Sequence, residues 1–227
     1  EKYYKCKHKS FLHKKKFVYG LTEINREKIK ISKFISNPGC YPTSVLIPLI
    51  PLLKNGLLKK NHFIVDSKSG VSGAGKVLKE QNLFSELNNN FFSYGLNNHK
   101  HYPEILQVLK KYGFVSSFAF VPHLLPVFSG IQTNIYIKGD KINYKNVVLV
   151  LKDFYKSETF VSVDNKNIPK LSDVQNTNNI KLSVHFDKFS NTIIIMSLLD
   201  NLVKGAAGQA IQNMNLMFDF NEHESLK

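Results

Sequence analysis

Three scarcities in the sequence exclude whole classes of protein. Two cysteines, Cys6 and Cys40, stand in 227 residues. These are too few for a disulfide scaffold, and they lack the CxxC spacing of a structural zinc site. No apolar stretch approaches the roughly 20 residues that cross a bilayer, and Glu1 to Lys16 lacks the apolar core of a signal peptide. We therefore expect a soluble, cytoplasmic protein with no metal centre and no membrane partner.

Arginine is almost absent, since Arg26 is the single arginine in a chain with a formal net charge of +14. Such a charge suggests a nucleic-acid-binding module, which would need a clustered lysine surface and would release DNA as salt rises. The lysines are instead scattered along the whole chain, as on solvated faces. We therefore expect no nucleic-acid partner, and a basic protein also suits anionic substrates and cofactors.

Apolar and aromatic residues are plentiful, at 43% and 12% of the chain, enough for a folded domain with a real core. Helices are expected over Thr43 to Leu53, Pro103 to Tyr112, Asn143 to Ser157 and Asn201 to Met217. Strands are expected over His62 to Ser67, Phe91 to Leu96, Phe114 to Val121, Gly130 to Lys138, Phe160 to Val163, Lys181 to Phe186 and Thr192 to Ser197. This mixed order, with hairpins, predicts an α+β sheet domain covered by helices on one face.

Cys40 follows a turn signal, Asn37-Pro38-Gly39, and precedes the first expected helix. The free N–H groups and the dipole at a helix N-terminus favour a thiolate, which is the nucleophilic form of cysteine. The local sequence is equally compatible with an inert buried cysteine at a turn. A nucleophile at Cys40 is therefore one of two readings at this point.

Two histidines, His99 and His101, could supply a base for such a thiol, because histidine exchanges its proton near neutral pH. A His-x-His on a loop is more often surface or structural. A metal site lacks a convincing third ligand, since Glu104 alone does not supply one.

A loop of small residues, Ser69 to Gly75, follows an expected strand. Its backbone N–H groups could bind an anion or let a planar ring approach closely. It matches neither a Walker A loop nor GxGxxG, so on its own it is a weak signal.

Read together and in order, the motifs resemble one family over essentially the whole chain. They are YGLTE (19–23), NPGCYPT (37–43), DSKSGVSGAG (66–75), HKHYPEI (99–105), PHL (122–124) and DNLVKGAAGQA (200–210). The family is N-acetyl-gamma-glutamyl-phosphate reductase. The alternative is an enzyme of the aspartate-semialdehyde dehydrogenase type. The residues of the motifs NPGCYPT (37–43) and HKHYPEI (99–105) argue against it.

The resemblance implies an activity, a cofactor and site residues. The activity is NADPH-dependent reduction of N-acetyl-L-glutamyl 5-phosphate to N-acetyl-L-glutamate 5-semialdehyde, with release of phosphate, in arginine biosynthesis. Cys40 matches the nucleophile that forms a thioester, and His99 matches the acid/base. Tyr94 and His101 match residues of the substrate site. The positions matching the cofactor side are Ser69, Gly70, Ser72, Gly73 and Asn201.

The resemblance also implies a fold of α/β plus α+β type. Residues 1–40 would be the remainder of a Rossmann NADP-binding domain. Residues 41–199 would be a glyceraldehyde-3-phosphate-dehydrogenase-like mixed-sheet domain that carries catalysis and oligomerisation. Residues 200–227 would be a C-terminal helix returning to the Rossmann domain. A homo-oligomer, dimer or tetramer, is expected.

Two departures from the family pattern affect these expectations. Residue 1 is not Met and no Gly-rich fingerprint occurs in Glu1 to Lys16, so we expect the front of the nucleotide-binding domain to be missing. Ser129 stands where the family usually has Arg, and Arg26, in what we expect to be a surface linker, is a poor substitute. Anion binding is thus the feature most affected. Retention of Cys40 and His99 argues against a decayed, inactive relative.

Overall fold

The computed structural model describes residues 11–75, 77, 79–139 and 142–226, so Cys6 lies outside the described residues. The helices are α1 (Thr22–Lys30), α2 (Cys40–Lys54), α3 (Phe84–Leu87), α4 (His101–Lys111), α5 (Tyr144–Tyr155) and α6 (Gly208–Met217). The strands are β1 (Val18–Tyr19), β2 (Ile35–Ser36), β3 (Phe63–Gly70), β4 (Phe92–Ser93), β5 (Phe118–Leu125), β6 (Ile131–Lys138), β7 (Val161–Asp164), β8 (Ile180–Asp187) and β9 (Thr192–Leu199).

Within the described ranges, seven strands form one mixed sheet in the order β4-β5-β3-β6-β9-β8-β7. The β3–β5 and β7–β8 pairs are parallel, and the other neighbours are antiparallel. The side chains of β6 point alternately to the two faces of the sheet, as in any strand, and Ile131, Ile135 and Ile137 are fully buried on one face. The predicted mixed-sheet domain is thereby confirmed.

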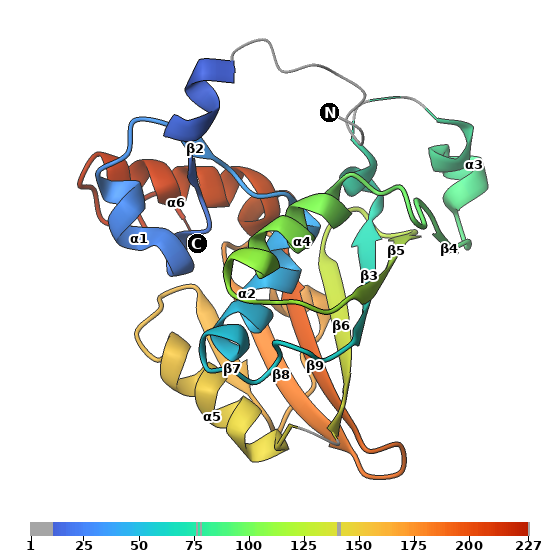
Figure 1. The fold of residues 1–227 in the computed structure, drawn as a ribbon. Coiled ribbons are helices and arrows are strands. Elements are labelled where there is room, and N and C mark those ends of the chain that lie inside the picture. The colour runs from blue at the N-terminus through green and yellow to red at the C-terminus, as the bar shows by residue number, and fades with distance from the viewer. Residues whose placement is uncertain (1–10, 76, 78, 140–141, 227) are drawn as a thin grey trace.

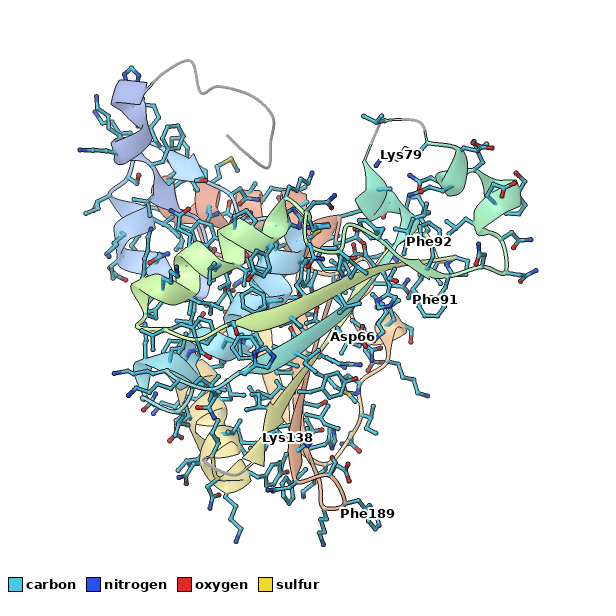
Figure 2. The ribbon with its side chains drawn as sticks, turned by 45° about the vertical axis from the view of Figure 1, so that its right-hand side comes forward. Asp66, Lys79, Phe91, Phe92, Lys138 and Phe189 are labelled. Carbon is cyan, nitrogen blue, oxygen red and sulfur yellow. The ribbon has the colours of Figure 1, made fainter. Side chains whose placement is uncertain are left out.

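Helices α2 and α5 cover one face of this sheet, and α4 packs on α2 (Figure 1). Helix α2 is buried from Tyr41 to Leu53, between the sheet and α4, which explains why it is apolar on every side. Figure 2 shows Asp66 and Lys138 on the opposite side of the sheet, away from α4. The core therefore lies between the sheet and α2, and Cys40 stands at the N-terminal end of that central helix.

A smaller unit joins both ends of the described chain. Strands β1 and β2 pair in parallel, and α1 packs against α6 beside them (Figure 1). The Thr22 hydroxyl donates to the Asn213 side chain at 2.8 Å, and the Asn213 amide donates to the Gly20 carbonyl at 2.8 Å. That residues 1–40 and 200–227 belong to a Rossmann domain stays a prediction, as does the three-part division of the chain.

Several expected elements are confirmed with shifted bounds. Strand β3 runs on to Gly70, so the small-residue loop begins two residues later than expected, because residues 63–70 pair along β5 and nearly as far along β6. Strand β5 begins at Phe118 and passes through Pro122. Helix α4 includes His101, which we expected in a loop.

The C-terminal helix and the location of Arg26 differ more from what we expected. Asn201 lies in a turn, followed by a π-helical turn, Val203–Ala207, and α6 begins only at Gly208. The expectation that Arg26 lies in a surface linker is wrong: it lies in α1 and forms ion pairs with Glu158 and Glu222. In the described part of the chain, no helix has the length and apolar character needed to span a membrane.

Candidate active site

Cys40 is the first residue of α2, as the turn-to-helix pattern predicted. Gly39 caps the helix with extended backbone, and its carbonyl accepts the Thr43 N–H at 2.9 Å. The Cys40 side chain is half-buried and borders a pocket of about 610 Å³. A cysteine so placed is reachable by a ligand in that pocket.

The resting thiol is protonated, contrary to the expectation that the helix N-terminus favours a thiolate. Burial raises the pKa of Cys40 to about 11, outweighing the backbone N–H groups of Tyr41 and Cys40 and the positive charge of Lys100. Desolvation penalises the charged sulfur more than these groups stabilise it. The thiol therefore needs a proton acceptor before it can attack.

His99 and His101 stand together against this pocket, their ring centroids 4.9 Å apart. Burial, and then the Lys100 charge, lower the pKa of His99 to about 4. Burial, His99 and Lys100 lower the pKa of His101 to about 3. Both rings are therefore neutral at physiological pH, and a neutral imidazole has one nitrogen free to accept a proton.

The two rings differ in hydrogen bonding. His99 Nδ1 accepts the His101 backbone N–H at 3.1 Å, so the proton of neutral His99 lies on Nε2, which is 3.4 Å from the Tyr94 hydroxyl. His101 Nδ1 has no hydrogen-bond partner among the described residues. The other edge of the His101 ring faces Gly39, where an added Cβ would lie 2.6 Å from Nε2. His99 is thus set to donate a hydrogen bond from Nε2, and His101 adjoins the residue before Cys40.

Aromatic rings form the floor of the pocket. The Tyr41 ring meets His99, His101 and Phe120 edge to face, at centroid separations of 5.5, 5.9 and 5.6 Å. The Tyr41 hydroxyl donates to the His123 carbonyl at 3.0 Å and lies 3.4 Å from the Tyr94 hydroxyl. These contacts hold the histidine rings and exclude water behind them.

The rim of the pocket is polar and basic. Its described lining residues are Cys40, Tyr41, Gly73, Ala74, Lys79, Gln81, Asn82, Phe92, Ser93, Tyr94, Gly95, Asn98, His99, Lys100, His101 and Leu124. No carboxylate occurs among them, and Lys79 and Lys100 supply positive charge. Figure 2 shows Lys79 and Phe92 on the side of the molecule that carries α3, and Phe92 belongs to the edge strand β4. Among the residues that the structure describes, no group of three or more histidine, cysteine or acidic side chains could hold a metal ion.

The five residues expected on the cofactor side lie together but mostly behind the pocket. Asn201 donates to the Ser72 hydroxyl at 2.9 Å and accepts the Gly130 N–H at 2.6 Å. Gly70 presses against backbone, since an added Cβ would lie 2.7 to 2.8 Å from atoms of residues 127–129. Of the five, Gly73 borders the pocket. The loop is thus held by Asn201 and by the backbone of residues 127–129, and its small residues Gly73 and Ala74 line the pocket.

Glu104 is a residue whose role the sequence did not reveal. Its Oε1 accepts the Gly39 N–H at 3.0 Å and the Tyr19 hydroxyl at 2.8 Å. The sequence shows Glu104 three residues after His101. It does not show that the side chain accepts a hydrogen bond from Gly39, because Gly39 lies 65 positions earlier in the chain. Ser129, where the resemblance led us to expect an arginine, is buried, and its hydroxyl donates to Asp200 at 3.1 Å.

Together, a mixed sheet and a half-buried cysteine that shares a pocket with two neutral histidines form an arrangement suited to thiol chemistry. The family described as "Semialdehyde dehydrogenase, dimerisation domain" matches residues 40–201. The chain belongs to this family.

Named relatives agree with that assignment. The N-acetyl-gamma-glutamyl-phosphate reductase of Caldicellulosiruptor saccharolyticus is 46% identical over 210 residues, covering 92% of this chain and 61% of that protein. The probable chloroplastic N-acetyl-gamma-glutamyl-phosphate reductase of Arabidopsis thaliana is 43% identical over 229 residues, covering 100% of this chain and 57% of that protein. The chain thus spans about three fifths of the length of these relatives.

Solved structures share the fold. Aspartate semialdehyde dehydrogenase II from Vibrio cholerae superposes with a TM-score of 0.69 at 18% identity, over 91% of this chain and 69% of that one. A probable aspartate-semialdehyde dehydrogenase from Pseudomonas aeruginosa gives 0.68 at 14% identity, over 89% and 68%. The chain therefore shares the fold of these two proteins over about nine tenths of its length.

Proposed function

We propose that the protein to which this chain belongs reduces N-acetyl-L-glutamyl 5-phosphate to N-acetyl-L-glutamate 5-semialdehyde, releasing phosphate, in arginine biosynthesis. The observation that carries the proposal is that Cys40, His99 and His101 border one pocket, in a chain 46% identical to a reductase of that name. Cysteine supplies the covalent step that divides one difficult reaction into two.

The first half-reaction needs only residues of this chain and the substrate. A histidine takes the Cys40 proton, the sulfur attacks the acyl carbon, and a thioester forms as the carbon–oxygen bond to phosphate breaks. Phosphate leaves with the bonding electron pair. Because the neutral thiol is the resting form, proton removal and attack occur together or in quick succession.

We assign the two histidines different parts in this chemistry. His99, matched to the family acid/base, carries its proton on Nε2 and is placed to donate a hydrogen bond from it to the negatively charged oxygen on the reacting carbon. For His99 to accept the thiol proton, its ring would have to lose the hydrogen bond that Nδ1 accepts from the His101 N–H, or its Nε2 would have to lose the proton it carries. His101, with Nδ1 unpaired and its other edge beside Gly39, is the second candidate to accept it. Tyr94, within 3.4 Å of His99, orients that ring and lines the substrate pocket.

Lys79 and Lys100 are proposed to take over anion recognition. Ser129 lies away from the pocket lining and is committed to Asp200, so it does not replace the arginine usual in the family. The two lysines border the pocket from different segments, and the proposed substrate carries both phosphate and carboxylate charge. A lysine binds phosphate as a point charge, without the bidentate geometry of arginine.

NADP is the proposed cofactor, and when bound it supplies the hydride that reduces the thioester. The loop that ends at Gly75 fits a planar ring, because Gly73 and Ala74 present no long side chain to the pocket. Ser69, Gly70, Ser72 and Asn201 would act by holding this loop. The pairing of β1 with β2, and of α1 with α6, supports assigning residues 1–40 and 200–227 to the nucleotide-binding side and residues 41–199 to the substrate domain.

A homo-oligomer, dimer or tetramer, is also proposed, and the family name "dimerisation domain" supports it. The sheet face that Asp66 and Lys138 occupy has no helix packed on it within the described ranges. Light scattering of the purified chain should give a mass above one copy, and Ile194→Lys on this face should lower it. A monomer at all concentrations would contradict this part.

The function is best tested first on the acylation half-reaction, which needs no nucleotide. The chain is incubated with N-acetyl-L-glutamyl 5-phosphate, and released phosphate and the mass of the Cys40 peptide are measured. We expect one acyl group on Cys40 per phosphate released, and none with Cys40→Ser. β-Aspartyl phosphate serves as the competing substrate, and preferential acylation by it would favour the aspartate-semialdehyde type.

The complete reaction is then tested on the chain joined to the nucleotide-binding segment of the Caldicellulosiruptor relative. NADP reduction is followed in the reverse direction with N-acetyl-L-glutamate 5-semialdehyde. The expected result is turnover that requires phosphate and disappears in Cys40→Ser. Turnover retained in that variant would exclude Cys40 as the nucleophile.

A further inference from the structure

An ion pair is buried where α1 meets the π-helical turn that follows β9. Lys204 Nζ lies 2.5 Å from Glu23 Oε1, and neither side chain has any exposed area. The ammonium also donates to Gln212 Oε1 at 2.6 Å and stands 5.7 Å from the centre of the Phe160 ring. Burial alone would raise the pKa of Glu23, but the charge and hydrogen bond of Lys204, together with hydrogen bonds from the Glu23 backbone and Gln212, keep that pKa below its ordinary value.

Lys204 belongs to the π-helical turn Val203–Ala207, in which Ala207 N–H reaches back to the Leu202 carbonyl at 3.0 Å. The ion pair draws the turn toward α1 at Lys204. The next residue, Gly205, then lies against the reactive cysteine: an added Cβ would be 2.8 Å from the Cys40 Cβ. The glycine is required because no side chain fits between the turn and Cys40.

A second contact ties the same turn to the segment before Cys40. The Asn37 side chain donates to the Ala206 carbonyl at 3.0 Å and accepts from Asn213 of α6 at 3.1 Å. The turn therefore touches the cysteine on one side and the loop that leads to it on the other. Its position is set at Lys204, the one residue of the turn with an ionic partner in the described structure.

We infer that Glu23 and Lys204 are positioning residues for the Cys40 thiol, which they hold in place and shield from water through Gly205. The pair touches neither substrate nor the sulfur itself. It links α1, on the proposed nucleotide side, to the nucleophile on α2. The inference uses the proposed function only in taking Cys40 as the reactive residue.

Alkylation of Cys40 by iodoacetamide tests this without substrate or cofactor, so the result does not depend on the proposed reaction. The rate is read by mass spectrometry from the Cys40 peptide, separately from that of Cys6, between about pH 7 and about pH 10. The main variant is the double replacement Glu23→Gln with Lys204→Met, which removes the pair without leaving a lone buried charge.

Burial raises the Cys40 pKa from its ordinary 9.0 to about 11, so release of the turn should lower it by up to two units. The thiolate population, and with it the alkylation rate below pH 9, should then rise by about ten- to hundredfold. Gly205→Ala, which leaves the pair intact but crowds Cys40, should also change the pH profile. Lys68→Met, which breaks the Lys68–Asp66 ion pair on the sheet, is the matched control and should leave the profile unchanged.

A pair that only stabilises the fold gives a different result. The double variant would then lower the midpoint of urea unfolding but keep the wild-type pH profile of Cys40, and that outcome would overturn the inference. Should the double variant not fold, Glu23→Gln alone is measured by the same criterion. In the reductase assay, loss of positioning lowers kcat and leaves KM near its wild-type value.

Discussion

Glu104 on α4 accepts a hydrogen bond from the backbone N–H of Gly39, the residue before Cys40, at a distance of 3.0 Å from Oε1 to the amide nitrogen. The same oxygen accepts the Tyr19 hydroxyl of β1. One carboxylate thus joins three segments far apart in sequence at the N-terminus of α2. Cys40 is positioned by this contact on one side and by Gly205 on the other.

The Glu104 contact should make stability depend on pH. Burial raises the pKa of Glu104 above its ordinary value of 4.5, against the hydrogen bonds from Gly39 and Tyr19. A carboxyl with a raised folded-state pKa contributes stability that is present below the unfolded pKa and is lost as pH rises through the folded value. Between about pH 4 and about pH 7, Glu104→Gln should therefore gain stability relative to wild type. Urea unfolding at both pH values measures the difference, and an equal difference at both would contradict the raised pKa.

Removing the Glu104 side chain should cost more than neutralising it. Glu104→Ala leaves the Gly39 N–H without its acceptor near the helix N-terminus, at a cost of about 1–3 kcal/mol. The control is Glu86→Ala, an exposed residue of α3, which should be nearly neutral. Chemical denaturation of the three proteins gives the comparison. A loss for Glu104→Ala no larger than for Glu86→Ala would show that the contact is unimportant.

The reactivity of Cys40 should keep rising with pH through the physiological range. Because its pKa is about 11, the thiolate fraction and the alkylation rate should increase about tenfold per pH unit from pH 7 to pH 10. Lys100→Gln removes a charge that lowers this pKa and should slow alkylation at any pH in the range. Lys111→Gln, at the far end of α4, is the control. A plateau beginning near pH 7 would mean that the thiolate is the resting form after all.

The two histidines should have separable effects on the half-reactions. His101→Asn should slow acylation of Cys40, and His99→Asn should act more strongly on the complete reaction, in which a hydrogen bond from Nε2 stabilises negative charge on the oxygen of the reacting carbon. Loss of a general acid or base lowers the rate by about 10²- to 10⁴-fold. Measuring phosphate release and NADPH turnover for both variants shows which half-reaction each histidine affects. If His99→Asn alone slows acylation, then His99 takes the thiol proton and its ring reorients in the complex.

The clamp beneath the small-residue loop can be tested with two glycines. Gly70 has an ordinary φ of −63°, but a Cβ there would press on the backbone of residues 127–129, so Gly70→Ala should cost about 1–3 kcal/mol. Gly56 has open space but a φ of 77°, so Gly56→Ala should cost about 1–2 kcal/mol through backbone strain. Only the first should also disturb the pocket, read as a change in Cys40 alkylation. An unchanged rate of Cys40 alkylation in Gly70→Ala would show that the position of this loop does not affect Cys40.

Patterns local in the chain were readable in advance. The alternation in Gly130 to Lys138 identified β6, and the Asn143 cap is present, its side chain accepting the Lys145 N–H at 2.8 Å. The turn before Cys40 placed it at a helix start. Strand β5 begins four residues later than expected and runs on through Pro122 to Leu125, because residues 118–125 pair with β3 over their whole length.

By itself, the sequence determined the mixed-sheet class, the position of Cys40 at the start of a helix and the family that its motifs resemble. Each element and each motif behind these conclusions consists of residues within a few positions of one another, and the family resemblance comes from reading the motifs in order along the chain. The tertiary structure alone decided the protonation state of the thiol, the contact of Glu104 with Gly39 and the contact of Lys204 with Glu23. Those properties depend on burial and on contacts between residues 65 to 181 positions apart, as in Gly39–Glu104 and Glu23–Lys204, and no local pattern encodes them.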